Sequence, residues 1–352
     1  MPPANTQKFV APPVHVVEVP DGVVLKRGCT EFKITGLQAG SVAKTVLSAV
    51  GEGGASVDDI CRMFSRSSAP RVQELIRELC ARRLLLPGDH KYSSTRVESS
   101  LDVFYWQFGE TQERAIAQFE HLQLHIVGVN AISRQLSYSL RASGWSTFTV
   151  IDHPQHRNPA FFDQNNTLNV QQWPNSLNAP QQWSEDQVHE WRGCVVVTSD
   201  SGGQEALRRW NRLCLNNSLN FMPIMLKNMV GYVGPYVIPK ETACYECLIA
   251  RRYSHANDFA LELSADQAAF EKQRAIGFHP TMATMLGDMG AFELTRWHIE
   301  PLPGRKPGKL LEVDLLASRM MERTVLKVPR CPACSPLHRH ARTNLAKTIF
   351  SG

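Results

Sequence analysis

The sequence has no long run of apolar residues. No stretch approaches the roughly 20 consecutive apolar residues that a membrane-spanning helix requires. The first ten residues also lack the apolar core of a secretory signal. We therefore expect no membrane association and no secretion, and a protein that resides in the cytoplasm.

An excess of charge of one sign is also missing. The 38 Lys and Arg and 33 Asp and Glu among 352 residues leave a formal net charge of +5, and the basic residues are spread among carboxylates. Proteins that bind nucleic acid usually concentrate basic residues on one face, so we expect no nucleic acid as a partner. With 43% hydrophobic residues, the chain has enough apolar material for a core. Its length allows two or three domains.

The N-terminal part changes from a β-like to a helical pattern. Its first dozen residues are rich in proline, and we expect them to be loose. Short strands separated by turn residues are expected at 15–19, 22–26 and 31–34. Helices are expected over 42–50, after a Ser56 cap and after Pro70, followed by an extended wing at 84–86. Three strands and three helices predict a winged helix-turn-helix domain over residues 12–90, with a linker at 91–110.

The remainder, residues 111–352, begins with a β-α-β pattern. A helix is expected at 112–118, then a buried strand at 122–127, Gly128, a helix, and a strand at 147–151 that ends in Asp152. Further strands are expected at 194–198, 221–226, 232–237, 310–314 and 324–327, with helices at 205–216 and 259–299 and a surface loop at 153–183. This order predicts a Rossmann-type α/β domain.

Two Cys-x-x-Cys motifs carry the strongest chemical signal, Cys244 with Cys247 and Cys331 with Cys334. Four thiolates suit a tetrahedral zinc ion with bonds of about 2.3 Å. A single Cys-x-x-Cys could instead be a redox pair. Two such motifs in a chain without a secretory signal favour a structural zinc site, with no coordination position left open for water.

Glycine is scarce where a nucleotide site would need it. The first strand is followed by Gly128-Val-Asn130-Ala-Ile, whereas a phosphate-binding loop of the form Gly-x-Gly-x-x-Gly has three glycines. Asp152 is suitably placed for a ribose hydroxyl, although an acidic residue at a strand end is also common without a ligand. The segment therefore predicts a degenerate nucleotide site.

These features resemble the ThiF-like (ubiquitin-activating-enzyme-like) family. The resemblance is carried by the paired cysteines and by residues 195–200, 209–211 and 239–248. It implies that Asp200 corresponds to the family aspartate that helps to hold magnesium. The family motif Asn-Leu-Asn-Arg-Gln is replaced by Leu-Asn-Val-Gln at 168–171, so valine stands in place of the phosphate-contacting arginine. Loss of the loop and the arginine would remove the main electrostatic stabilisation of adenylyl transfer.

The N-terminal domain resembles the RiPP recognition element, a winged-helix domain that binds leader peptides in pathways that modify ribosomally made peptides. The matching runs are 14–19, 24–28, 34–36 and 56–60. Together, the two domains resemble the cyclodehydratase partner (C-protein or ocin-ThiF type) of thiazole/oxazole-modified microcin biosynthesis. In that family a YcaO protein uses ATP to cyclise Cys, Ser or Thr of a precursor peptide.

This resemblance sets the expected partners and cofactors. The chain has no room for a YcaO domain after residue 345, so we expect YcaO to be a separate polypeptide that itself uses the ATP and magnesium. We expect the chain to bind the precursor leader and to be a homodimer within a larger complex.

An exposed edge strand can accept an extended peptide as one more strand. The expected edge is the run Glu31, Phe32, Lys33 and Ile34, with the third helix as the second wall, including Arg71, Leu75 and Arg77. Lys33, Arg71 and Arg77 could attract an acidic leader, or they could simply be a solvated surface.

Three hypotheses follow. The first is a non-catalytic leader-binding partner of a cyclodehydratase. The second is an active ATP-dependent enzyme that adenylates the C-terminus of a peptide or sulfur carrier, which the missing glycines and arginine oppose. The third is a winged-helix DNA-binding regulator. Glu74 and Glu78 oppose it, because acidic residues on a groove-facing helix would repel phosphates.

Overall fold

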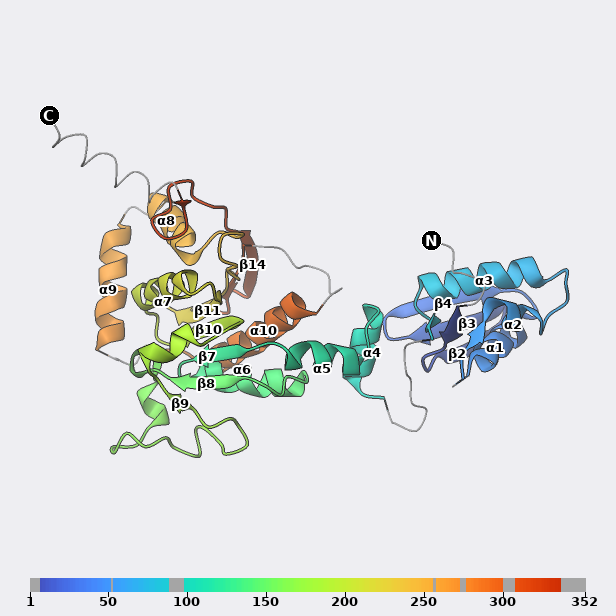
Figure 1. Cartoon of the computed structure of the whole chain (residues 1–352), viewed down its shortest axis with the longest axis horizontal. Coiled ribbons are helices and arrows are strands. Elements are labelled where there is room, and N and C mark those ends of the chain that lie inside the picture. The colour runs from blue at the N-terminus through green and yellow to red at the C-terminus, as the bar shows by residue number, and fades with distance from the viewer. Residues whose placement is uncertain are drawn as a thin grey trace. The chain divides into compact units, whose positions relative to one another are not determined.

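The computed structural model describes residues 7–51, 53–88, 98–255, 258–272, 277–299 and 308–336. The chain divides into two compact units, Met1–Ala115 and Ile116–Gly352 (Figure 1). Each is described by itself. Among the described residues, no helix combines the length and the apolar character needed to cross a membrane.

The first unit contains an antiparallel sheet of β2 (His15–Val19), β3 (Gly22–Arg27) and β4 (Thr30–Thr35), with β3 in the centre. Helices α1 (Ala39–Val50), α2 (Val57–Cys61) and α3 (Ala69–Ala81) follow. The expected start of α2 is confirmed, because the Ser56 side chain accepts a hydrogen bond from the Asp59 amide. Alternating residues of β3, including Val23 and Leu25, are buried against the helices.

The N-terminal segment is not loose throughout. Residues Lys8–Val10 form β1, which lies between β5 (Ala55–Ser56) and β6 (Leu86–Pro87) in a second small sheet. Phe9 and Val10 are buried. Proline-rich neighbours concealed this strand in the sequence, because its two apolar residues find partners only far along the chain.

The linker expected at 91–110 is wrong for its second half. Helix α4 (Ser100–Gln107) belongs to the core of the first unit, and Trp106 is fully buried there. Its indole N–H donates a 2.8 Å hydrogen bond to the Arg83 carbonyl. Glu98 binds the buried Arg27 guanidinium at 2.5 and 2.9 Å. Residues 91–97 lie outside the described residues. Helix α5 (Gln112–Glu120) leads into the second unit.

The second unit is built on a mixed sheet, which has eight strands among the described residues, in the order β14-β13-β12-β11-β10-β7-β8-β9. The five strands from β11 to β9 in this order are parallel, and the other three are antiparallel. The strand bounds are Leu124–Val127 (β7), Thr149–Asp152 (β8), Gln181–Gln182 (β9), Cys194–Ser199 (β10), Asn220–Lys227 (β11), Val230–Val233 (β12), Lys309–Asp314 (β13) and Arg319–Thr324 (β14). The expected α/β architecture is confirmed.

Helices cover both faces of this sheet (Figure 1). On one face, α7 (Gln204–Asn216), α8 (Tyr245–His255) and α9 (Phe259–Glu271) pack together, and Leu207 of α7 joins Val195 and Val197 in one core. On the other face, α6 (Ala131–Ala142) packs on α10 (Pro280–His298), whose Gly290 lies against Ile224. Because side chains alternate along a strand, residues of opposite parity serve the two faces.

Two expected elements differ from those observed. The last strand, expected at 324–327, is β14 at 319–324, an exposed edge strand that carries no apolar pattern to reveal it. The surface loop expected at 153–183 contains the short 3₁₀ helices Pro154–His156 and Pro159–Phe161, and a third one, Glu185–His189, follows β9.

Candidate functional site

The paired cysteines form a compact cluster. Cys244 and Cys247 lie at the start of α8, Cys331 and Cys334 follow β14, and all four Sγ atoms lie within 4.8 Å of one another. Individual Sγ–Sγ distances are 3.9 Å (Cys244–Cys247), 3.6 Å (Cys244–Cys331) and 3.5 Å (Cys247–Cys334). Tetrahedral coordination with bonds of about 2.3 Å would separate the sulfurs by about 3.8 Å. The cluster could therefore hold a metal ion.

The surroundings of the cluster favour thiolate at Cys247. Hydrogen bonds from the thiols of Cys244, Cys331 and Cys334 hold the pKa of Cys247 below its ordinary value, and the amide of Val328 adds a bond of 3.4 Å to the same sulfur. Thiolate is the form that binds metal. An amide that donates to a ligand sulfur also fixes its orientation.

The residues between the first two cysteines fasten the cluster to α7. The amide of Tyr245 donates to Asn211 Oδ1 at 3.0 Å. Glu246 is buried and accepts a 2.9 Å hydrogen bond from Arg208 Nε, and Arg212 lies 3.4 Å from the same carboxylate. Hydrogen bonding to Glu246 raises the pKa of Arg208 above its ordinary value. These bonds join the four-cysteine cluster and α7 into one block.

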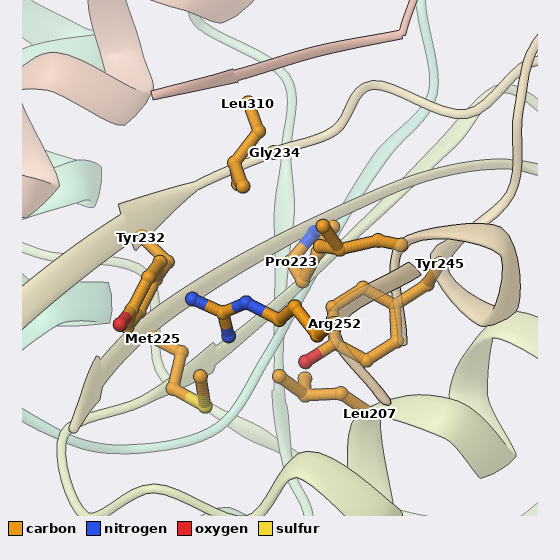
Figure 2. Close-up of a pocket in the computed structure, with 9 residues that line it drawn as sticks. Leu207, Pro223, Met225, Tyr232, Gly234, Tyr245, Arg252 and Leu310 are labelled. Atoms are coloured by element: carbon orange, nitrogen blue, oxygen red, sulfur yellow. The ribbon is translucent and has the colours of Figure 1, made fainter. Parts of the chain in front are cut away.

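A pocket of about 220 Å³, partly open to solvent, lies beside this block (Figure 2). Tyr245 and Arg252 of α8 line it together with Tyr232 of β12. The Arg252 guanidinium points into the pocket and stacks on the Tyr232 ring at 4.4 Å, with Glu312 at 4.0 Å. The Arg252 side chain therefore forms part of the pocket wall.

The loop after β7, which the sequence predicts to be a degenerate phosphate loop, is held by contacts within the protein. Gly128 has φ +113°, and a Cβ there would lie 2.8 Å from Asn130 Nδ2 and 2.9 Å from the Thr198 carbonyl oxygen. Asn130 caps α6, because its Oδ1 accepts from the amides of Ile132 (3.1 Å) and Ser133 (3.0 Å). Gly128 thus serves local packing, without need of a phosphate.

Asp200 also binds the N-terminus of α6. Its Oδ2 accepts hydrogen bonds from the amide of Ala131 (3.1 Å) and from Asn158 Nδ2 (2.7 Å), and only 3% of the residue is exposed. Burial raises the pKa of Asp200. Asn130 and Asp200 already accept hydrogen bonds from the first three amides of α6. A phosphate at this terminus would therefore find these three amides taken, and the Asp200 carboxylate would repel it.

Asp152 also has an internal partner. Arg157 binds it with two hydrogen bonds of 2.5 and 2.7 Å, and the Arg157 guanidinium stacks on the Phe162 ring at 4.6 Å. A ribose hydroxyl would have to compete with this ion pair. Val170, which stands where the family motif has arginine, is 57% exposed and has no side-chain donor. The structure therefore brings Gly128, Asn130 and Asp200 together at the N-terminus of α6, where hydrogen bonds within the protein already use the polar groups.

The expected peptide edge in the first unit is an edge strand. β4 lies at one end of the sheet, and its exposed residues Glu31 and Lys33 alternate with the half-buried Phe32 and Ile34. The amide of Gly36 donates to the Asp21 carbonyl at 2.9 Å. This bond shows which residues of β4 direct their amides toward β3, because the direction alternates along the strand. By alternation, the amides of Glu31 and Lys33 point away from β3, toward the open edge.

The flanking side chains largely have charged partners of their own. Lys33 pairs with Asp21 at 2.7 Å, Glu31 with Lys26 at 2.5 Å, and Arg77 with Glu74 at 3.2 Å. Arg71 is exposed on α3, and Leu75 is half-buried against the core of the unit.

The residue beside β4 that sequence reasoning missed is Arg82. It directly follows α3, and its guanidinium lies 4.4 Å from the Phe32 ring. A cation at the end of an amphipathic helix gives no sign in the sequence of which strand it will reach.

Comparison with known proteins gives the fold. No protein-family model and no curated protein matches the sequence. The structure of E. coli MccB with selenomethionine MccA matches with a TM-score of 0.64 at 14% identity, covering 93% of this chain and 100% of that one. MccB has also been solved with ATP, and that structure matches with a TM-score of 0.63 at the same identity, covering 93% of this chain and 100% of that one.

Heterocyclases match as well. TruD matches with a TM-score of 0.61 at 17% identity, over 96% of this chain and 44% of that one. A heterocyclase in complex with substrate and cofactor matches with a TM-score of 0.59 at 16% identity, over 95% of this chain and 41% of that one. The chain spans less than half the length of these heterocyclases. Its structural neighbours are thus MccB and heterocyclases, as the resemblance to ThiF-like proteins predicted, and it has their fold along most of its length.

Proposed function

We propose that the chain is the non-catalytic, leader-binding partner of a cyclodehydratase. It binds the leader of a ribosomally made precursor peptide and presents the peptide to a separate YcaO protein, which uses ATP to form thiazolines or oxazolines. The observation that carries this proposal is the closed α6 terminus, where Asp200 binds the amide of Ala131 at 3.1 Å. A fold shared with heterocyclases supports a role beside such an enzyme.

The first unit is the proposed winged-helix recognition element. An extended leader would add as a strand beside Glu31–Ile34, using the outward amides of Glu31 and Lys33, with α3 and its residues Arg71, Leu75 and Arg77 as the second wall. The Arg82–Phe32 contact supplies a cation and an aromatic ring next to that edge. These groups suit a leader that carries both apolar and acidic residues.

The four-cysteine cluster is the proposed structural zinc site. Its sulfur-only donor set suits zinc, and four thiolates leave no position for a reacting water. Zinc would join α8 to the segment after β14 and thereby hold the far end of the sheet together. In this proposal ATP and magnesium are used by the YcaO partner, and the chain works as a homodimer within the complex.

One observation favours a second candidate function, an active adenylating enzyme. A structure of MccB, which shares the fold, contains ATP. Adenylation would require Asp200 to leave Ala131 and Asn158 and to bind magnesium instead. The two functions differ in a simple assay, because only an adenylating enzyme exchanges pyrophosphate into ATP.

Reconstitution tests the proposal directly. A YcaO protein encoded near this chain would be incubated with its precursor peptide and ATP, with and without the chain. We expect dehydration of the peptide, a mass loss of 18 Da per ring as water leaves, only when the full-length leader and the chain are both present. Equal conversion without the chain would contradict the proposal. Light scattering on the same mixture measures the stoichiometry.

A further inference from the structure

Helix α9 is held to the second unit by few groups. Of its described side chains, only Asp266 and Phe270 are buried, and Leu261 is 65% exposed. Both buried side chains reach the same place, the Gly202-Gly203 turn that joins β10 to α7. Leu263 also packs against the core, and Glu262 pairs with Lys227 at 2.8 Å. A helix attached through so few side chains can open locally without unfolding the core.

The Asp266 carboxylate takes the place of an anion at the N-terminus of α7. Its Oδ2 accepts hydrogen bonds from the amides of Gly203 (3.1 Å) and Gln204 (2.8 Å). The Lys227 ammonium, 7% exposed, lies 3.8 Å from Asp266 Oδ1 and also pairs with Glu262 at 2.8 Å. Two amides at a helix N-terminus, the helix dipole and a buried cation together make a set of groups that binds oxyanions.

The turn is shaped for close approach. A Cβ on Gly202 would lie 2.4 Å from Asp266 Oδ1, and a Cβ on Gly203 would lie 2.5 Å from the Phe270 ring. Both glycines have positive φ, +81° and +87°, which only glycine adopts readily. The same lack of side chains would let a ligand reach the amides once α9 had moved.

Two buried polar side chains beside this turn lack partners among the described residues. The His156 ring, 2% exposed, lies 5.6 Å from the Phe270 ring, and neither of its nitrogens has a hydrogen-bond partner. Gln204, 1% exposed, has a side-chain oxygen without a partner. Unpaired buried groups destabilise a fold, and a ligand that bonded them would remove that cost.

We propose that Asp266 occupies a binding site for phosphate or a phosphoryl group and that α9 is the lid that carries it. When α9 moves away, the amides of Gly203 and Gln204, the Lys227 ammonium and the His156 imidazole line one crevice. It lies at the carboxyl end of β10 and β11, where open α/β sheets bind ligands. The site is separate from the α6 terminus, which Asn130 and Asp200 close. This inference does not depend on the proposed leader-binding function.

The test uses the full-length protein with inorganic phosphate as the probe. Asp266→Asn keeps the side-chain shape but removes the charge, so we expect faster hydrogen exchange in the amides of α9 and phosphate binding that is tighter than in the wild type by about tenfold. Calorimetry measures the binding. Adding Lys227→Met to Asp266→Asn should abolish phosphate binding but keep the fast exchange.

Glu271→Gln is the matched control, because Glu271 lies on the same helix and accepts a 2.6 Å hydrogen bond from Gln267 of α9. It should exchange and bind phosphate like the wild type. Unchanged exchange in Asp266→Asn would overturn the lid, and absence of phosphate binding in that variant would overturn the site. Should Asp266→Asn lose its metal or its native circular dichroism, Phe270→Ala replaces it. That variant must then show fast α9 exchange that phosphate slows, or the proposal is wrong.

Discussion

The amide of Ala131, the first residue of α6, donates a 3.1 Å hydrogen bond to the carboxylate of Asp200, which directly follows β10. In the same unit, Asp266 binds the first amides of α7. The helix N-termini that follow β7 and β10 are therefore both occupied by carboxylates of the chain. At both termini, where a helix dipole favours an anion, the negative charge comes from the chain itself.

This arrangement predicts the behaviour toward ATP. We expect no exchange of pyrophosphate into ATP above background, with or without peptide, because a nucleotide phosphate would have to displace Asp200 from Ala131. Asp200→Asn should leave that background unchanged and reduce the free energy of unfolding by about 1–3 kcal/mol, since it weakens two hydrogen bonds to a buried carboxylate. Exchange activity that disappears in Asp200→Asn would favour an adenylating enzyme.

The four-cysteine cluster predicts one zinc ion per chain. Cys331→Ala should lower the zinc content and the melting temperature together, because metal-binding energy in such sites is folding energy, about 10–16 kcal/mol for small zinc peptides. Plasma emission spectroscopy and thermal unfolding measure the two effects. Cys29→Ala is the control, since Cys29 is exposed in a turn of the first unit, and it should change neither quantity. Freshly purified, unchelated protein without zinc would refute the assignment.

The open edge of β4 predicts where the leader binds. Lys33→Pro removes an amide that points away from β3, so it should weaken leader binding strongly and leave the unit folded. Glu18→Pro is the matched control on β2, the opposite edge of the same sheet, and should bind the leader normally. Calorimetry is best done on residues 1–115, because the core of the first unit includes Trp106. Equal affinity of both variants would exclude β4.

Charge at this surface should matter less. Arg71→Glu combined with Arg77→Glu should weaken an acidic leader modestly, since exposed ion pairs are worth about 0–1 kcal/mol each and Arg77 already pairs with Glu74 at 3.2 Å. It should also reduce the dependence of binding on salt, which calorimetry at two ionic strengths measures. A complete loss of binding in this variant would mean that charge, and not the strand edge, dominates.

The sequence predicted those parts of the fold that rest on local signals. Periodicity and the Ser56 cap identified most strands and helices of both units, and the Cys-x-x-Cys spacing identified the four cysteines that the structure brings together. It could not reveal β1 or α4, because Phe9 and Trp106 are buried by residues that lie far away in the sequence. The same limit applies to the site. The resemblance predicts that Asp200 corresponds to the family aspartate that helps to hold magnesium, but its bond to Ala131 depends on how β10 lies beside β7.

Buried histidines predict that stability falls on mild acidification. Burial lowers the pKa of His156 to about 3 and that of His125 to about 4. Because these values lie below the ordinary value near 6.5, the unfolded chain binds more protons, and stability that is present above pH 6.5 is lost as the pH falls toward 4. Each histidine should cost about 2 kcal/mol between pH 7 and pH 5. Urea unfolding at pH 7 and pH 5 measures this loss of stability. In His156→Leu the loss should be smaller by the contribution of one histidine, whereas replacement of the exposed His15 by glutamine should leave it unchanged. An unchanged pH dependence in His156→Leu would show that the pKa of His156 is the same in the folded and the unfolded chain.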